Sequence, residues 1–200
     1  MFFAVIGDIK SNFSGLQALL DALRHEGIQR VLHTGNVCAG PDGAHECLAL
    51  LRERGVICVQ GRQDKVLLKS GRRKGSDVAD SRTDQTRALL GSTAIEYLHG
   101  LPRKRSLSEE GLRIVLCHGA VSSAREILSA DTPVERFRRE REIDLADIIV
   151  SGGATSPFAF NVDQTLFVSA GVMTDSDGRP RYTLVNAESQ PWSATSIRLQ

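Results

Sequence analysis

The chain has 200 residues, of which 41% are hydrophobic and 24% are charged, and its formal net charge is +1. This length and composition suit one globular domain with a substantial core, so we expect a single domain over residues 1–200, with about 187–200 as a C-terminal strand or tail. The near-neutral charge argues against binding of nucleic acid or of an anionic membrane through the overall electric field.

The start of the chain is apolar up to Ile6 but is followed at once by Gly7 and Asp8. It has no basic leader, no small-residue cleavage site and no apolar run approaching the roughly 18 residues of a membrane span. We therefore expect a core strand and no membrane association. Four cysteines without CxxC spacing predict small buried residues and no disulfide framework, as is usual in a reducing compartment, and the sequence favours a cytoplasmic location.

The first part of the chain predicts two βαβ units. Phe2–Ile6 is a continuous apolar run, leucines then recur at helical spacing, and Arg30–Thr34 is a second β-like run. Ala44–Arg54 predicts the next helix and Val56–Val59 the next strand, with Gly55 at the helix C-cap. A mostly parallel sheet follows from this order.

The middle of the chain is less regular. The polar stretch Lys65–Arg87 predicts a loop or a short irregular excursion. Beyond it, Ala88–Leu98 predicts a helix, Leu112–Leu116 a strand and Ala124–Leu128 a short helix. A charged helix is then expected to run to about Ile143, because Thr132-Pro133-Val134-Glu135 supplies an N-cap, a proline at N1 and a capping-box glutamate.

The last part of the chain predicts short strands in antiparallel hairpins, which would build a second sheet. They are expected at Ile148–Val150, Phe158–Phe160, Thr165–Ser169, Arg181–Asn186 and Thr195–Leu199. The whole pattern predicts an α/β protein, a four-layer α/β/β/α sandwich of two mixed sheets with helices outside.

In such folds, functional groups gather in the loops at the carboxyl ends of the parallel strands. Four segments of this chain follow expected strands in that way. They are Gly7-Asp8-Ile9-Lys10, Thr34-Gly35-Asn36, Gly61-Arg62-Gln63-Asp64 and Cys117-His118-Gly119.

With Ser151-Gly152-Gly153-Ala154-Thr155, these segments resemble the motifs GDxH, GD, GNHD, HG and GHxH of the calcineurin-like metallophosphoesterase family, in its small prokaryotic phosphodiesterase form. The resemblance extends over about residues 1–186. It implies the metallophosphoesterase fold and a site in which two divalent ions such as manganese, iron or zinc share a bridging aspartate. In that family the metals activate a water molecule and hold the phosphate oxygens.

Carried over position by position, the resemblance leaves Asp8 and His118 in place and changes six of the family's positions. The replacements are Lys10 for a histidine ligand, Asn36 for the bridging aspartate, Arg62 for an asparagine ligand, Gln63 for the histidine that assists the leaving group, and Gly153 and Thr155 for the histidines of GHxH. The formal charge around the metal positions changes from about −2 to about +1, which repels dications.

We therefore expect a metallophosphoesterase-like pseudoenzyme that holds no metal cofactor and has no catalytic residue. His118 is the weak candidate for catalysis, and a neutral histidine with a satisfied hydrogen bond is the favoured interpretation of it. An ion pair of Lys10 or Arg62 with Asp8 is expected to replace the metals. The remnant metal-ligand positions are Asp8, Asn36 and His118, and the candidate ligand-binding residues are Asp8, Lys10, Asn36, Arg62, Gln63, His118 and Thr155.

Arg62 also begins a basic stretch, whose other members are Lys65, Lys69, Arg72, Arg73 and Lys74. Such runs are usually solvated faces, but recognition of a phosphate group by Lys10, Arg62 and nearby hydroxyls stays open. Nucleic acid is disfavoured, because no aromatic residue is interleaved with the charges. Asp64 is expected to accept hydrogen bonds from loop backbone, as the last residue of GNHD does in the family.

The leading interpretation is a binding or scaffold module for a phosphate-containing small molecule or a protein partner. The chain resembles the retromer scaffold subunit and the small subunits of some replicative DNA polymerases in having an eroded phosphoesterase site. The alternative is a residual metal-dependent phosphodiesterase or phosphatase that acts on a small phosphodiester through His118 or a single metal. A homo-oligomeric structural protein is a third interpretation.

Overall fold

The computed structural model describes residues 1–70 and 81–199, which fold around two five-stranded sheets. In spatial order the first sheet contains β10 (Ser193–Arg198), β9 (Arg181–Asn186), β1 (Phe2–Ile6), β2 (Val31–His33) and β3 (Ile57–Cys58). The second sheet contains β4 (Lys104–Glu109), β5 (Leu112–Cys117), β6 (Ile148–Ser151), β8 (Thr165–Ser169) and β7 (Phe158–Val162). The helices are α1 (Phe13–His25), α2 (Ala44–Glu53), α3 (Arg62–Lys69), α4 (Ser81–Gly100) and α5 (Val134–Ile143).

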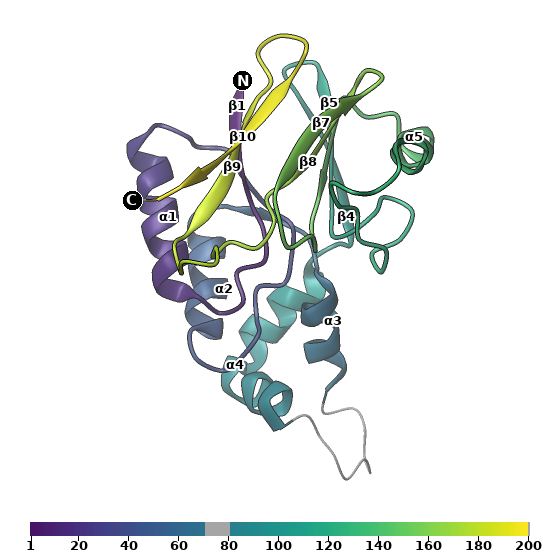
Figure 1. Cartoon of the computed structure of the whole chain (residues 1–200). Helices are drawn as coiled ribbons and strands as arrows, with labels where there is room; N and C mark the ends of the chain where they lie inside the picture. Colours follow the sequence, from purple (N-terminus) through teal and green to yellow (C-terminus); the bar gives the residue numbers. More distant parts are fainter. Residues whose placement is uncertain (71–80, 200) are drawn as a thin grey trace.

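The two sheets pack face to face, with α1 and α2 on the outer side of the first sheet and α5 on the outer side of the second (Figure 1). Alternation along β1 produces the layers: Phe3 and Val5 point into the core between the sheets, whereas Ala4 and Ile6 pack in the core that contains α1 and α2. On the outer side of the second sheet, α5 buries Phe137. These layers confirm the expected α/β/β/α sandwich.

Both sheets are mixed: in the first, antiparallel strands lie on one side of the parallel strands, and in the second they lie on both sides. In the first sheet β1, β2 and β3 are parallel, and in the second sheet β5, β6 and β8 are parallel. The C-terminal hairpins were expected to build the second sheet together, and this is wrong in part. Hairpin β7–β8 joins the second sheet, but β9 pairs antiparallel with β1, with Ala4 opposite Leu184, and so extends the first.

The irregular excursion expected over Lys65–Arg87 is wrong where the structure describes it. Helix α3 covers Arg62–Lys69, and α4 is already helical from Ser81, with an interruption at Gly91. The charges of α3 conceal its amphipathic pattern, in which Leu67 and Leu68 are buried. Residues 71–80, and with them Arg72, Arg73 and Lys74 of the expected basic stretch, lie outside the described part of the chain.

Two smaller expectations also fail, and one strand was not predicted. Ala124–Leu128 forms turns and extended chain instead of a helix. Helix α5 begins at Val134 with Pro133 at its cap, while the hydroxyl of Thr132 accepts a hydrogen bond from the amide of Ser129 (2.9 Å). Strand β4 was not expected, because its side chains are mostly exposed and give no apolar pattern.

The four cysteines are buried and free, as expected for a chain without a disulfide framework. Among the described residues, no helix has both the length and the apolar character needed to span a membrane.

Candidate functional site

Five loops meet at the carboxyl ends of the parallel strands of both sheets. The loop after β1 joins the loop after β2, because the amides of Ile9 and Lys10 both donate to the carbonyl of Asn36 (3.2 Å each). The loop after β6 approaches the loop after β2 so closely that a Cβ added at Gly152 would lie 2.5 Å from Oγ1 of Thr34. The expected gathering of the motif segments is therefore found.

Asp64 organises the loop after β2 from within α3. Its side chain is fully buried and its carboxylate accepts hydrogen bonds from the backbone amides of Asn36 (2.8 Å), Val37 (2.9 Å) and Gly61 (2.9 Å). Buried amide groups need partners, and one carboxylate supplies them to two loops. The role expected for Asp64 is confirmed.

Asn36 is held from both ends of its side chain. Its Nδ2 donates to Oδ2 of Asp8 (2.9 Å), and its Oδ1 accepts from the backbone amide of Gln63 (2.8 Å). These two bonds assign the orientation of the amide, because the group that faces Gln63 must be an acceptor. A hydrogen-bond donor therefore faces Asp8 at the position where the family has its bridging carboxylate.

Asp8 is buried, with 6% of its surface exposed, and its Oδ1 has no hydrogen-bond partner among the described residues. Burial raises the pKa of this carboxyl, while the Asn36 hydrogen bond and the charges of His118 and Lys10 act to lower the pKa. The expected ion pair with Lys10 or Arg62 is wrong. In the described part of the chain, the neighbour that satisfies Asp8 is the amide of Asn36, and both cationic side chains are exposed.

His118 follows β5 and is 1% exposed. Its Nδ1 lies 2.8 Å from the carbonyl oxygen of Thr34, so Nδ1 carries the proton and donates. The hydrogen bond fixes the ring as well as the tautomer, and it matches the interpretation of His118 as a buried histidine with a satisfied hydrogen bond.

The loop after β6 offers no ligating side chain. Gly153 has a φ of +78°, and a Cβ there would overlap Cδ1 of Ile127 while lying 3.6 Å from Cε1 of His118. Ile127 thus covers the place from which a histidine at position 153 would reach toward His118. Thr155 is exposed.

The residues present do not fit a two-metal centre. Within residues 1–70 and 81–199, no group of three or more His, Cys, Asp or Glu side chains is arranged to hold a metal ion. An Asn36 amide donor and an added Lys10 charge also stand where dications need anionic oxygens.

The remaining candidate residues surround the buried centre. Lys10 and Ser11 have φ values of 54° and 63°, a turn that leaves the Lys10 side chain exposed. Arg62 and Gln63 begin α3 and are exposed. The structure therefore places Asp8, Asn36 and His118 inside, with Lys10, Arg62, Gln63 and Thr155 at the surface around them.

A cavity of about 690 Å³ lies beside this centre, and sequence reasoning missed most of it. Arg62 and Lys65 line it, but so do Arg103, Lys104 and Arg125, which come from two other segments. The one sequence signal was the basic run that begins at Arg103, and nothing local indicated that it would face α3.

The fold and the position of this site define the class of the protein as a metallophosphoesterase-type α/β sandwich. The model of the calcineurin-like phosphoesterase superfamily domain matches residues 1–190, and the chain belongs to that superfamily.

Three relatives illustrate the similarity. An uncharacterized protein of Methanocaldococcus jannaschii is 24% identical over 178 residues, which are 87% of this chain and 71% of that protein. A hypothetical protein from Pyrococcus horikoshii superposes with a TM-score of 0.81 at 18% identity, over 100% of this chain and 88% of its own. A metallophosphoesterase from Sphaerobacter thermophilus gives 0.78 at 18% identity, over 100% and 89%. Both structural matches show a shared fold.

Proposed function

We propose that this protein is a non-catalytic member of the superfamily, a pseudoenzyme that serves as a binding or scaffold module for a phosphate-containing ligand. The observation that carries the proposal is the hydrogen bond from Asn36 Nδ2 to Asp8 Oδ2. It supports a centre closed by internal hydrogen bonds, because the same amide is also used by Gln63. The exposed Lys10 and Arg62 supply positive charge that phosphate recognition needs.

Metal binding is tested first by thermal unfolding of chelator-treated protein with manganese or zinc. A metal that binds only the folded state stabilises it, by about 2.7 kcal/mol at 100 times its Kd. We expect no rise in Tm. A rise that Asp8→Ala abolishes would contradict the proposal. Asp131→Ala, which removes an exposed carboxylate elsewhere, is the matched control.

Hydrolysis is tested with a chromogenic phosphodiester and manganese. We expect no turnover above that of the Asp8→Ala variant. Turnover that both Asp8→Ala and His118→Ala abolish would establish the alternative, a residual metal-dependent phosphodiesterase.

As a scaffold, the protein would bind either a different protein or a second copy of its own chain. The solution mass of the purified protein separates these two: a dimeric mass supports the homo-oligomer, and a monomeric mass leaves a different protein as the partner.

A further inference from the structure

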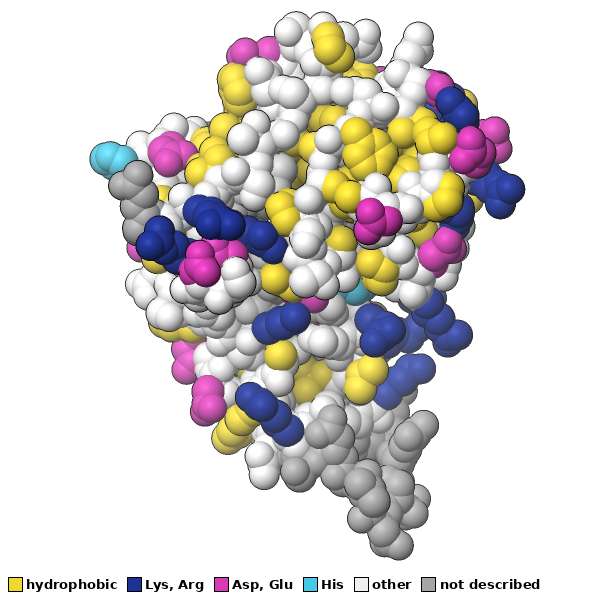
Figure 2. Space-filling model, viewed as in Figure 1, with side chains coloured by type: hydrophobic (Ala, Val, Ile, Leu, Met, Phe, Trp, Pro, Cys, Tyr) yellow, Lys and Arg dark blue, Asp and Glu magenta, His cyan; other side chains and the backbone are white. Residues whose placement is uncertain are grey.

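The cavity beside the former metal site is lined by cations from three segments of the chain. Helix α3 contributes three of them, the segment entering β4 contributes two, and the loop after β5 contributes one. They are Arg62, Lys65, Lys69, Arg103, Lys104 and Arg125. Figure 2 shows Lys and Arg side chains gathered on this face, over α3 and the chain beside it.

The residues that the structure describes neutralise little of this charge. Among residues 1–70 and 81–199, no carboxylate lines the cavity. Lys104 is paired with Asp144 (2.8 Å), whereas the other five form no ion pair within the described part of the chain. Burial together with the charges of Arg103, Lys69 and Arg125 lowers the pKa of Lys65, as is expected where like charges lie around one cavity.

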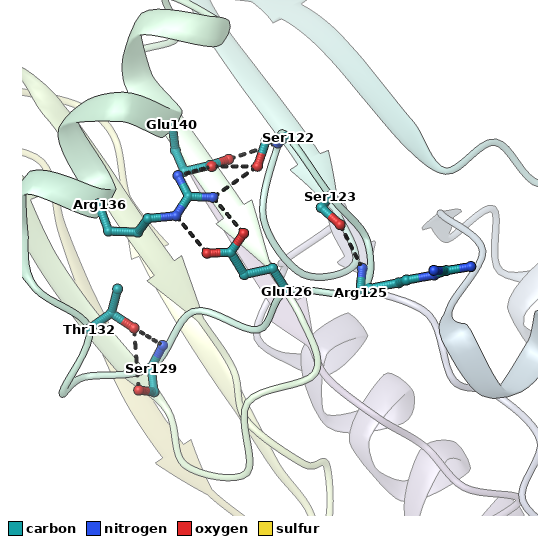
Figure 3. A network of polar contacts seen from close by, with 8 residues as sticks. All are labelled: Ser122, Ser123, Arg125, Glu126, Ser129, Thr132, Arg136 and Glu140. Carbon is teal, nitrogen blue, oxygen red and sulfur yellow. Dashed lines mark hydrogen bonds and ion pairs between the residues drawn. The ribbon is translucent and has the colours of Figure 1, made fainter.

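The loop after β5 is fixed by a polar network (Figure 3). Glu140 of α5 is fully buried and accepts from the amide (2.8 Å) and hydroxyl (2.7 Å) of Ser122, and it pairs with Arg136. The guanidinium of Arg136 also donates to both carboxylate oxygens of Glu126 (2.6 and 2.7 Å). The side chain of Arg125 points away from this network (Figure 3) and lines the cavity.

The shape and chemistry of the cavity restrict its ligand. Its volume lies within the range of about 300–1,000 Å³ that is usual for small-molecule sites. A single phosphate group carries about −1.5 to −2 charges at pH 7, which cannot balance five unpaired cations. No aromatic side chain of the described residues lines the cavity, so these residues offer no platform on which a nucleobase would stack.

We infer that this cavity binds a small polyphosphate, an anion with two or more linked phosphate groups. The inference rests on the proposed binding function and gives it a place and a ligand class. Lys65 of α3 and Arg125 of the loop after β5 line the cavity and would contact the ligand. Ser123 also lines it; its hydroxyl oxygen accepts a hydrogen bond from the amide of Arg125 (3.3 Å), and the hydroxyl proton can be donated to the ligand.

The test is calorimetric titration with sodium tripolyphosphate and with orthophosphate, both in the presence of a chelator. Tripolyphosphate is expected to bind at least about tenfold more tightly. Lys65→Gln and Arg125→Gln are each expected to weaken it by about tenfold, the usual effect of losing a charge-assisted hydrogen bond. Arg139→Gln, which removes an exposed α5 cation outside the cavity lining, is the control and leaves binding unchanged.

Three results would overturn the inference. They are equal affinity for both anions, equal weakening by Arg139→Gln, and tighter binding of a single-stranded oligonucleotide than of tripolyphosphate at the same salt concentration. Orthophosphate binding that Lys10→Gln weakens and Lys65→Gln does not would reject the cavity but keep the proposed function. Absence of binding by both anions rejects both.

Discussion

Asp8 is a buried carboxylate whose Oδ1 atom has no partner among the described residues, and this arrangement costs stability. Burial raises the pKa of Asp8 above its ordinary value, so the folded state holds the proton more tightly than the unfolded state. The favourable contribution of the protonated form is therefore present in acid and is lost as pH rises through the raised pKa. At a pH above this raised pKa, an ionised Asp8 opposes folding.

Asp8→Asn is accordingly expected to raise the free energy of unfolding by about 1 kcal/mol at pH 7, since it removes a buried charge and keeps an oxygen for the Asn36 amide. The gain should shrink toward pH 3, where the wild-type carboxyl is also neutral. Urea unfolding at the two pH values measures both effects. A loss of stability at pH 7 would contradict this account.

Asp64→Asn is the matched control for that substitution. The Asp64 carboxylate accepts hydrogen bonds from the backbone amides of Asn36, Val37 and Gly61. In an asparagine, the side-chain NH2 group would face one of these N–H donors and leave it without an acceptor. A loss of about 1–3 kcal/mol is expected, as for other buried groups left without a partner.

Sequence comparison with the family motifs was sufficient to find the substituted positions, but not what the new residues do. The ion pair expected for Asp8 does not form, and the side-chain amide of Asn36 donates a hydrogen bond to this carboxylate instead. The cover over Gly153 could not be predicted either. It depends on Ile127, which lies in a loop with no regular structure, and its placement follows from tertiary contacts.

At the scale of elements, α5 and the loop after β5 form one unit through Glu140. Removing one partner of a buried charge pair leaves the other charge uncompensated, which costs about 3–5 kcal/mol. Glu140 is fully buried but keeps its Ser122 donors, so Arg136→Met is expected to lower the free energy of unfolding by about 2–4 kcal/mol. Denaturant unfolding measures the change.

Arg138→Met is the control on the same helix. Arg138 is exposed, and its nitrogens lie 3.8 Å from a Glu135 oxygen and 3.7 Å from an Asp163 oxygen. Exposed pairs contribute about 0–1 kcal/mol, so little change is expected. Equal effects of the two substitutions would show that the network does not hold the loop.

Elements with an apolar periodicity were predicted well, and those whose exposed surface dominates the sequence were not. The strands β1 and β8 are almost wholly buried; β1 is a continuous apolar run, and β8 has the apolar residues Leu166, Phe167 and Val168 at its centre. By contrast, α3 has only three buried residues, one of them the carboxylate Asp64, so its sequence resembles a loop. The basic cavity is lined by α3, the start of β4 and the irregular loop after β5. None of these three segments has a strong apolar pattern, so the sequence did not predict that they would lie together.

At the scale of the whole molecule, the layered fold was predictable because every strand of a sheet directs alternate side chains to opposite faces. In β1, one set of side chains packs between the sheets and the other packs in the core that contains α1 and α2. The same close packing buries His33 completely at the end of β2. Burial, with the nearby charge of His118, lowers the pKa of His33 to about 3. An imidazole in the unfolded chain titrates near 6.5, so protonation of His33 in acid favours the unfolded state.

The sign of the pH effect follows from proton uptake. Between about pH 6.5 and 3 the unfolded state binds a proton at His33 that the folded state does not, so stability is present above this window and is lost as pH falls through it. From pH 7 to pH 5 the loss is about 2 kcal/mol. Asp8 changes stability in the opposite direction in acid, so a His33 variant is needed to isolate the contribution of His33. His33→Asn should remove about 2 kcal/mol from the difference in unfolding free energy between pH 7 and pH 5. His25→Gln, at the exposed end of α1, should retain the wild-type difference. An unchanged difference in His33→Asn would assign the acid sensitivity to other groups.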